Sequence, residues 1–469
     1  MKQKPKTKRP KSASASSQGV SARIYYTARP ALTRQNTLLA VVVTGFILRM
    51  VWVAIAKTEP VSDFAWYERR AVELLAGDGY KNNAGNPTAF WPIGYPLFLA
   101  AIKAVGGTSP IAVGIVQATL STVSIWLTYE IARRVVSPGW AVLASAVVAF
   151  NPSQIVYASV EGTETLFTLL FLSSLLLLLR VTPEKLDRRQ LLLIGVIVGY
   201  AMLVRAVALL LPVLFIAFLW WQLPKGKRLI PVAAFAIGVA VIVSPWLIRN
   251  VIVMGTPSLS TSGGVNFRIG NGPGATGEWR NFAPGDPILD YEGEAERDRA
   301  GYTLTFKDIA ADPARVIKLI PRKMSLLWWS DESGFYWSLT SRSENTPRIP
   351  QARLIQLNDT FWKWFLVFAV AGVVAAYARN RTTRTSMLLM AILGYWVVMH
   401  AALIANDRFH MPVIPIMGIF AVFGLMTASE YVSRAFAGAE AATDPGLRGE
   451  TPQGAANARS KRARKRGHA

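Results

Sequence analysis

The sequence predicts an all-α, polytopic membrane protein built on a bundle of about ten transmembrane helices. Three observations predict this fold class. Hydrophobic residues make up 52% of the 469-residue chain. Only 17% of the residues are charged, whereas a soluble domain of this length is normally about a quarter charged. Apolar runs of roughly 20 residues, the length that crosses a bilayer core of about 30 Å, recur along the chain.

The surplus of Lys and Arg in cytoplasmic loops gives these runs an orientation. An even number of spans puts both basic ends of the chain on one side, and the ten predicted spans cover residues 37–56, 109–130, 139–157, 162–180, 190–204, 206–222, 229–248, 360–378, 385–404 and 411–429. The loops that then face the cytoplasm carry twelve Lys or Arg residues, whereas loop 249–359 on the opposite side carries 13 basic and 13 acidic residues. The asymmetry predicts a multi-pass protein of the cell membrane with both termini in the cytoplasm.

The same pattern divides the chain into regions. In order these are a basic cytoplasmic tail (1–36), a transmembrane core (37–248) that includes the first extracytoplasmic loop (57–108), an extracytoplasmic region (249–359), C-terminal transmembrane helices (360–430) and a second basic tail (431–469). Much of the net charge of +23 lies in the tails, without the interleaved aromatic residues of a nucleic-acid-binding surface. We therefore expect the tails to contact anionic lipid, and we expect no nucleic-acid partner.

The first outer loop has an internal pattern of its own. From Asp63 to Ala76 the apolar residues recur at intervals of three or four, which predicts an amphipathic helix. Ser62 or Asp63 is placed to cap this helix and Gly77 to end it. The next apolar run, 90–105, is short and contains two prolines and a lysine, so we interpret it as an interfacial or re-entrant helix.

Ionisable residues in or beside membrane helices are costly and often functional. On the predicted topology several of them converge at the extracytoplasmic face or just beneath it: Asp63, Arg69, Glu161, Glu164, Arg249, Arg408 and Arg49. Arg205 also interrupts an apolar stretch. A carboxylate can deprotonate or orient an acceptor hydroxyl, and guanidinium groups can hold a phosphate leaving group. This set of residues suits transfer from a lipid-linked phosphate, which has to be met at the membrane surface.

Each residue also has a structural interpretation. Asp63 can cap its helix, and Glu161 and Glu164 can favour a helix N-terminus through its dipole. The arginines can extend to the membrane interface or pair with backbone carbonyls.

Metal chemistry has little support in the sequence. Cysteine is absent, which excludes disulfides and thiolate ligands. The histidines are His400, His410 and His468, and they have no ligand spacing with the carboxylates. The sequence therefore identifies no cofactor and leaves the metal undecided, with a divalent ion held by Asp63 or a glutamate as the open alternative.

Several of these residues lie in strings that resemble the GT-C glycosyltransferases, in the branch of the dolichyl-phosphate-mannose-protein mannosyltransferases and their bacterial relatives, which include aminoarabinose–lipid A transferases. The resemblance extends in order over residues 37–430. Its strings are Ser62–Tyr80, Trp91–Ala100, Asn151–Tyr157, Glu161–Phe167, Pro245–Asn250, Gly270–Asn271 and Arg408–Pro412.

The resemblance implies a GT-C-type bundle with an outer site, a polyprenyl-phosphate sugar as donor and an inverting hexosyl or pentosyl transfer. It implies Asp63 as the general base or acceptor-positioning carboxylate, Arg249 and Arg408 as phosphate ligands, Glu164 as an acidic position at a helix start, and Asn271 as a substrate-site candidate. The chain departs from the family where Phe64 follows Asp63 instead of a glutamate, and it has no counterpart of the large luminal module. The acceptor therefore stays open among protein, glycolipid and polysaccharide.

A polytopic transporter or lipid-carrier-handling protein without transferase activity is the main alternative. Its charged residues would line a path across the bilayer, whereas here they gather at one face and we find no convincing internal repeat. A structural scaffold would leave the gathering of charges unexplained.

Overall fold

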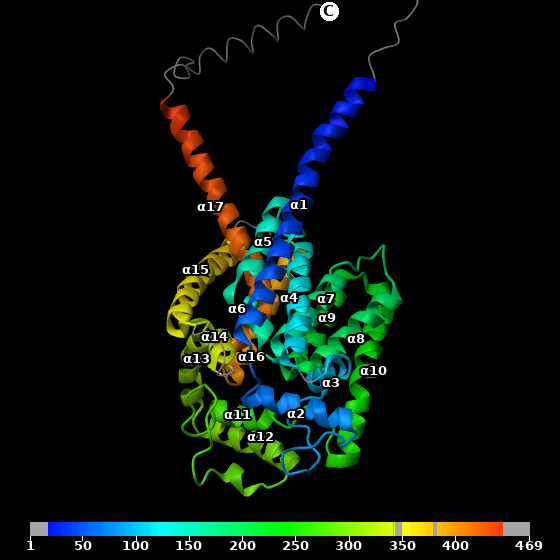
Figure 1. Cartoon of the computed structure of the whole chain (residues 1–469), viewed down its shortest axis with the longest axis vertical. Coiled ribbons are helices and arrows are strands. Elements are labelled where there is room, and N and C mark those ends of the chain that lie inside the picture. Colours follow the sequence, from blue (N-terminus) through cyan, green and yellow to red (C-terminus); the bar gives the residue numbers. More distant parts are fainter. Residues whose placement is uncertain (1–16, 108, 341, 343–348, 379–381, 444–469) are drawn as a thin grey trace, which may run out of the picture.

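The computed structural model describes residues 17–107, 109–340, 342, 349–378 and 382–443. The predicted tails, 1–36 and 431–469, lie outside this part of the chain at 1–16 and 444–469, and their other residues belong to helices. Every named element in these ranges is a helix, which confirms the predicted all-α class. Helices α1 (Ser17–Ala56) and α17 (Ile414–Thr443) extend beyond the bundle at the same end (Figure 1). Which end faces the cytoplasm stays a prediction.

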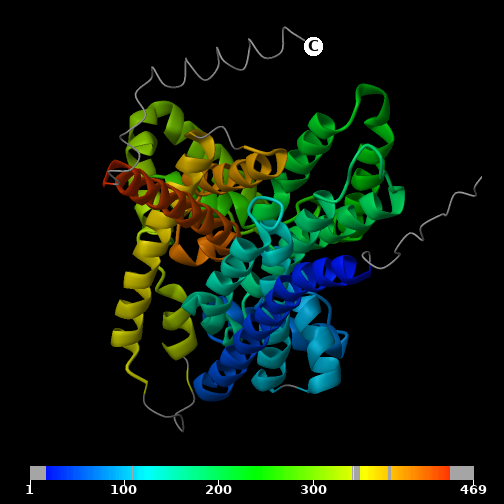
Figure 2. The same cartoon turned by 90° about the horizontal axis from the view of Figure 1, so that it is seen from above.

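The bundle is made of helices that coincide with the predicted spans. After α1 they are α4 (Pro110–Ala132), α5 (Pro138–Phe150), α6 (Pro152–Val156), α7 (Thr163–Leu178), α8 (Arg188–Val204), α9 (Leu211–Gln222), α10 (Leu229–Met254), α15 (Gln351–Ala378), α16 (Arg384–Ala402) and α17. Short 3-10 turns join some of them: η1 (Tyr157–Ser159), η2 (Ala206–Leu210), η3 (Lys225–Lys227) and η5 (Asp407–Val413). Seen from above, α15 lies on one side and α8 to α10 on the other, with α4, α5 and α7 between them (Figure 2).

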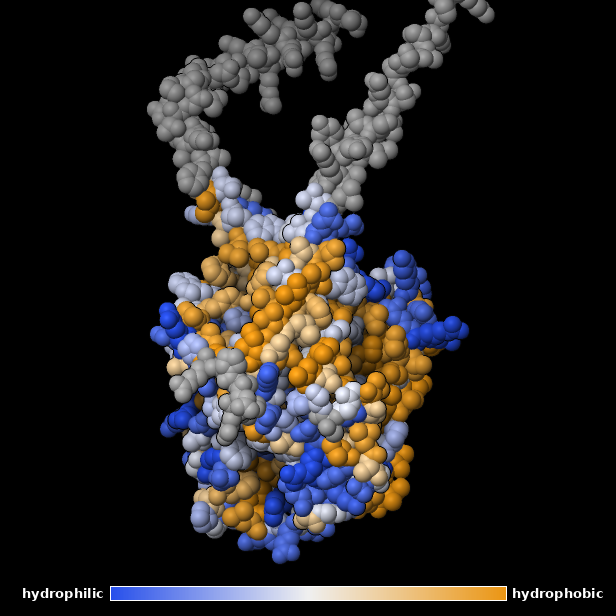
Figure 3. All heavy atoms as spheres, viewed as in Figure 1, coloured by the Kyte–Doolittle hydropathy of each residue, from blue (hydrophilic) through white to orange (hydrophobic). Residues whose placement is uncertain are grey.

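Six described helices are long and apolar enough to cross a membrane, and a seventh span forms if α5 and its continuation through Ser159, bent by 58°, count together. The other predicted spans correspond to α7, α8 and η2 with α9, which are shorter. The count of ten therefore stays a prediction. The surface agrees with a membrane location, because apolar residues cover the middle of the bundle (Figure 3). Polar residues gather at the end opposite the α1 and α17 extensions, which we call the covered end (Figure 3).

The first outer loop folds as a shelf across the end of the bundle opposite the α1 and α17 extensions (Figure 1). Its amphipathic helix α2 (Ser62–Ala76) confirms the predicted helix and buries Phe64, Tyr67 and Ala71. Gly77 ends α2 with a φ of 81°, the left-handed conformation that glycine adopts without strain. The predicted side-chain cap is wrong, because the N-cap residue is Val61 and neither Ser62 nor Asp63 caps the helix.

Helix α3 (Gly94–Gly106) occupies the second apolar run of this loop. At 13 residues it is about 20 Å long, too short to cross a bilayer core of about 30 Å as a straight helix. Its place beside α2 and α4 agrees with the interpretation as an interfacial or re-entrant helix.

Region 249–359 contributes four helices and a short turn to the covered end of the molecule (Figure 1). They are α11 (Gly263–Asn271), η4 (Pro287–Asp290), α12 (Glu294–Ala311), α13 (Pro313–Trp328) and α14 (Ser333–Thr340). Buried Arg268 fixes α11 to its neighbours, since its guanidinium lies 2.6 Å from Asp286 and 2.9 Å from Asp308.

Glycine permits a close pairing of helices α8 and α10. A Cβ atom on Gly195 would lie 2.1 Å from the carbonyl oxygen of Phe235, and one on Gly238 would lie 2.2 Å from that of Leu192. Small residues let membrane helices approach closely enough to gain packing energy, so these two glycines set the distance between α8 and α10.

Replacing Gly238 by Leu should therefore lower the thermal stability of the detergent-solubilised protein, because the added side chain has to push backbone aside. Overpacking of this kind typically costs about 1–3 kcal/mol. Gly394→Leu is the matched control, since a Cβ on Gly394 of α16 meets nothing within 4 Å. Equal melting temperatures for the two variants would contradict the close contact.

Candidate active site

Four charged side chains from four segments meet beneath the shelf, and we call Asp63, Arg408, Glu164 and Arg205 the charge chain. Asp63 comes from the start of α2 and Arg408 from η5, and Arg408 Nη2 lies 3.2 Å from Asp63 Oδ2. Glu164 comes from the first turn of α7, and its Oε1 lies 3.6 Å from Arg408 Nε and 2.6 Å from Arg205 Nη1. Acids and arginines thus alternate.

Glu164 is the fully buried centre of the charge chain. Its Oε1 faces both arginines, while its Oε2 has no hydrogen-bond partner among the described residues. The preceding Gly162 makes room for this oxygen, since a Cβ there would lie 2.4 Å from Oε2. A buried carboxylate needs opposite charges close by, and both arginines supply them.

Arg205 reaches Glu164 because the helix breaks at this residue. Helix α8 ends at Val204, and Arg205 itself is extended, with φ −142° and ψ 124°. Its guanidinium also donates to Thr163 Oγ1 at 3.1 Å and lies 5.7 Å from the ring centre of Phe409. In the sequence Arg205 stands out as the interruption of an apolar stretch, a pattern that does not predict its contact with Glu164.

Asp63 is the more accessible of the two carboxylates, with its side chain 31% exposed against 1% for Glu164. It follows Ser62, a non-glycine residue held at a φ of 54°. Such a conformation is kept where the surroundings fix it, and it occurs often at functional sites. The charge chain therefore ends in a partly exposed carboxylate paired with an arginine.

Buried tyrosines line the charge chain. Burial raises the pKa of Tyr67, and the charge of Asp63 adds to the shift, so its hydroxyl stays protonated. The hydroxyl of Tyr157 is buried without a partner among the described residues, and Glu164 and Arg408 are among the charges acting on it. Glu164 Oε2 and the Tyr157 hydroxyl oxygen are thus two buried polar atoms of the site without a hydrogen-bond partner among the described residues.

A histidine fixes η5, the segment that carries Arg408. The His410 ring is fully buried and stacks 4.0 Å from the Trp362 ring and 5.8 Å from the Trp328 ring. Its Nδ1 donates to the Leu327 carbonyl oxygen at 2.6 Å, and its Nε2 lies 3.1 Å from Asp331 Oδ1. These contacts tie η5 to α13 and α15.

Glu161 lies near the charge chain in a second buried cluster. It is only 3% exposed, and both carboxylate oxygens lack a hydrogen-bond partner among the described residues. Burial raises the pKa of Glu161 to about 7, with the charge of Lys103 opposing and that of Glu68 adding to the shift. Lys103 itself is paired with Glu68 at 2.8 Å.

The structure does not bring Arg249 or Arg49 into the charge chain. Arg249 donates to the carbonyl oxygens of Tyr80 and Thr88 at 2.8 and 2.7 Å, which holds the first outer loop against α10. Arg49 is fully buried and donates to the carbonyl oxygen of Ala149 at 3.0 Å, among other contacts. Their predicted role as phosphate ligands stays a prediction.

Arg69 and Asn271 also make contacts elsewhere. Arg69 donates to Asn83 Oδ1 at 3.3 Å within the first outer loop. Asn271 donates to the Ala402 carbonyl oxygen at 2.7 Å and accepts from Lys323 Nζ at 2.7 Å, which joins α11, α13 and the end of α16. Their role as substrate-site residues stays a prediction.

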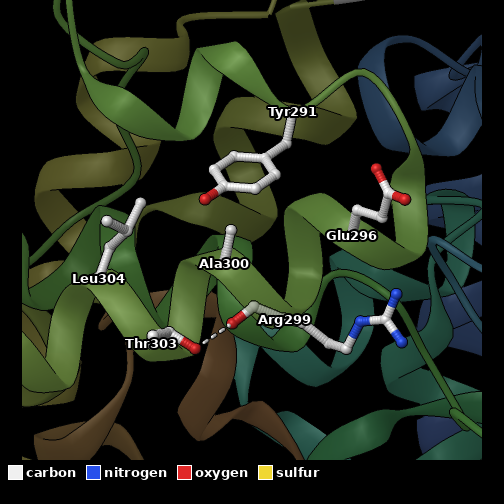
Figure 4. A pocket seen from close by; sticks show the side chains of 6 residues that line it. All are labelled: Tyr291, Glu296, Arg299, Ala300, Thr303 and Leu304. Carbon is white, nitrogen blue, oxygen red and sulfur yellow. Dashed lines mark hydrogen bonds between the residues drawn. The ribbon is translucent and has the colours of Figure 1, made fainter.

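Two further features complete the survey of the described residues. No group of three or more His, Cys, Asp or Glu residues in this part of the chain could hold a metal ion. A pocket of about 450 Å³ lies against α12, where Tyr291, Glu296 and Arg299 line it (Figure 4). None of its lining residues belongs to the charge chain.

The fold and the charge chain define a polytopic membrane protein with a polar site under the α2 shelf. A family model described as dolichyl-phosphate-mannose-protein mannosyltransferase matches residues 91–248, about a third of the chain. No curated protein matches the chain by sequence.

Solved structures share the fold. The archaeal oligosaccharyltransferase AglB from Archaeoglobus fulgidus, in complex with an inhibitory peptide and a dolichol-phosphate, has a TM-score of 0.50 at 14% identity, over 87% of this chain and 52% of its own. The apo form of the Archaeoglobus fulgidus oligosaccharyltransferase has a TM-score of 0.51 at 12% identity, over 88% and 52%. ArnT from Cupriavidus metallidurans, bound to undecaprenyl phosphate, is a weaker match, with a TM-score of 0.38 at 11% identity over 82% and 77%.

The chain therefore has a GT-C-type membrane fold and resembles the dolichyl-phosphate-mannose-protein mannosyltransferase family, as its sequence strings predict. It spans about half the length of the oligosaccharyltransferases that it matches.

The raised pKa of Glu161 predicts a pH-dependent stability. A carboxyl group with a pKa of about 7 when folded and about 4.5 when unfolded stabilises the fold fully below pH 4.5 and loses that contribution as the pH rises through 7. The melting temperature of the parent should fall relative to Glu161→Gln between pH 5 and pH 8. Glu296→Gln, on the surface, is the control. If the melting temperatures of the parent and of Glu161→Gln change with pH in the same way, Glu161 is not desolvated in the folded protein.

Proposed function

We propose that this protein is an integral-membrane, inverting glycosyltransferase that moves a sugar from a polyprenyl-phosphate donor to an extracytoplasmic acceptor. The observation that carries the proposal is the pairing of the partly exposed Asp63 carboxylate with Arg408, 3.2 Å away, at the covered end of a membrane bundle. A carboxylate and a guanidinium are the two groups this reaction needs, one for the acceptor proton and one for the phosphate. The GT-C-type fold supports the same class of reaction.

The arginines have capacity left for a phosphate. Among the described residues, the guanidinium of Arg408 makes one hydrogen bond, to Asp63, and its buried Nε has no hydrogen-bond partner. Arg205 adds a second positive charge on the other side of Glu164. With two acids and two arginines the charge chain has no net charge, so an arriving phosphate would meet N–H donors without an excess of negative charge.

The reaction then proceeds in one displacement. The acceptor hydroxyl oxygen attacks the anomeric carbon, and Asp63 takes the hydroxyl proton. The bond from that carbon to the phosphate oxygen breaks, and its electron pair leaves with polyprenyl phosphate, whose charge Arg408 and Arg205 stabilise. Because attack comes from the side opposite the leaving group, the configuration of the anomeric carbon inverts.

The proposal places the site on the extracytoplasmic face with both termini in the cytoplasm. The acceptor is a protein, a glycolipid or a polysaccharide.

The proposed transfer reaction needs no metal ion, because the two arginines supply positive charge at the phosphate. Transfer by the purified protein should thus survive removal of divalent ions with EDTA, and loss of activity that Mn²⁺ or Mg²⁺ restores would show that a metal takes part.

Asp63→Asn tests the proposed base. Asparagine retains the shape of the side chain but cannot accept a proton at neutral pH, and general-base catalysis typically contributes about 10²–10⁴-fold. The variant should insert and melt like the parent yet lose most transfer of sugar from a matched polyprenyl-phosphate donor. Asp63→Glu should recover little, because one added methylene moves the carboxylate by about 1 Å. Near-parental turnover by Asp63→Asn would remove Asp63 from the mechanism and leave Glu161 and Glu164 as the next candidates.

Arg408→Ala tests the proposed phosphate ligand. Loss of a charge-assisted contact costs roughly 1.5–3 kcal/mol, so affinity for polyprenyl phosphate should fall about ten- to a hundredfold. Arg299→Ala, at the surface pocket of Figure 4, is the control and should bind like the parent. Unchanged binding by a folded Arg408→Ala would contradict the proposed donor site.

A further inference from the structure

A pocket of about 320 Å³ is lined in part by the segment that leads to Arg408, and we call it the Trp329 pocket. It opens between the end of α13, the start of α14 and the segment that leads into η5. Its lining includes Trp329, Tyr336, Glu332, Asn406 and Asp407. Asp407 is the neighbour in sequence of Arg408, so the pocket and the charge chain share one short segment. The volume is within the range of small-molecule sites.

Aromatic rings form one part of this lining. Trp329 is 67% exposed and Tyr336 is 46% exposed, so both rings are open to a ligand. An indole offers a wide apolar face at little conformational cost. The apolar face of a pyranose ring, which presents only C–H groups, is a suitable partner for it.

Polar groups form the other part. No hydrogen bond involves the Glu332 carboxylate within the described residues, and burial together with the charges of Asp359 and Asp407 raises its pKa, which Lys363 opposes. Asn406 uses its side-chain oxygen on the Arg408 amide at 3.0 Å, so its amide nitrogen is left to donate. A carboxylate acceptor and an amide donor beside an indole match the paired hydroxyl groups of a sugar.

Asp407 fixes the pocket wall. Its Oδ2 accepts from the backbone amides of Glu332 and Ser333 at 2.7 and 2.8 Å, which orients the start of α14. Asp407 is buried and its carboxylate is occupied, yet it adds negative charge to the wall next to Glu332. Two acids at one wall disfavour a phosphate and favour an uncharged ligand with hydroxyl groups.

We propose that the Trp329 pocket binds a pyranose ring, stacked on Trp329 and held by Glu332 and Asn406. That this ring belongs to a saccharide acceptor rests on the proposed function. The sugar of the donor has the same chemistry, so the experiment has to separate the two sources. The contrary outcome is that Trp329 contacts only lipid headgroups and binds no sugar.

The first measurement is saturation-transfer NMR on the full chain in nanodiscs, with methyl α-mannopyranoside, methyl β-glucopyranoside and methyl β-galactopyranoside as probes. At least one probe should bind. Trp329→Ala should weaken that binding about tenfold, and Glu332→Gln should weaken it as well. Trp279→Ala is the matched control, because Trp279 is 64% exposed but lies outside the pocket, and it should bind like the parent. Binding by none of the probes, or equal binding by Trp329→Ala, would overturn the proposal.

The second measurement is binding of sugar-free polyprenyl phosphate and of a polyprenyl-phosphate sugar by the same variants. If the ring is that of an acceptor, Trp329→Ala should bind both lipids like the parent. Weaker binding of only the sugar-bearing lipid would assign the pocket to the donor sugar and overturn the acceptor assignment. Weaker binding of both would mean that Trp329 contacts lipid and would overturn the pocket itself. Parental lipid binding by Arg408→Ala, with methyl-glycoside binding lost in Trp329→Ala, would reject the proposed donor site while supporting the pocket.

Discussion

The shared carboxylate of Glu164 is the contact on which the site depends. It is buried in a largely apolar bundle, where an ionised carboxylate is very costly unless opposite charges lie against it. Arg205 and Arg408 both reach its Oε1, at 2.6 and 3.6 Å. Removal of Glu164 would leave Arg408 with Asp63 as its carboxylate partner, and it would take from Arg205 the carboxylate at 2.6 Å. The local backbone follows from this requirement, including the helix break at Arg205 and the glycine at position 162.

The rest of the fold brings Asp63, the fourth member of the charge chain, to these three residues. The α2 shelf carries Asp63 across the end of the bundle, and η5 carries Arg408 up to it from the opposite direction. The His410 ring stacks against Trp328 and Trp362 and donates a hydrogen bond to α13, which fixes the position of η5 in the bundle. The distance between Asp63 and Arg408 is thus set by two separate parts of the molecule. A partly exposed carboxylate next to an arginine results at the surface of a membrane bundle.

Much of this arrangement could be predicted from the sequence by one physical rule, that ionisable residues in or beside membrane helices are costly and often functional. The rule found Asp63, Glu164 and Arg408, and it singled out Arg205. It could not separate these residues from Arg49 and Arg249, because a sequence does not tell whether an arginine faces a carboxylate or a backbone carbonyl. Periodicity predicted α2 and its end at Gly77, whereas the N-cap was missed because Val61 holds that position and Asp63 turns toward Arg408. The Trp329 pocket joins residues some 70 positions apart, and no local pattern marks it.

An experimental structure of the protein with bound polyprenyl phosphate would test the account most directly. The account predicts the phosphate oxygens within hydrogen-bond distance of the Arg408 guanidinium, with Arg205 behind Glu164 and the Asp63 carboxylate facing the open side. A phosphate bound instead at Arg249, which contacts the Tyr80 and Thr88 carbonyl oxygens, would contradict the assignment of the charge chain as the donor site.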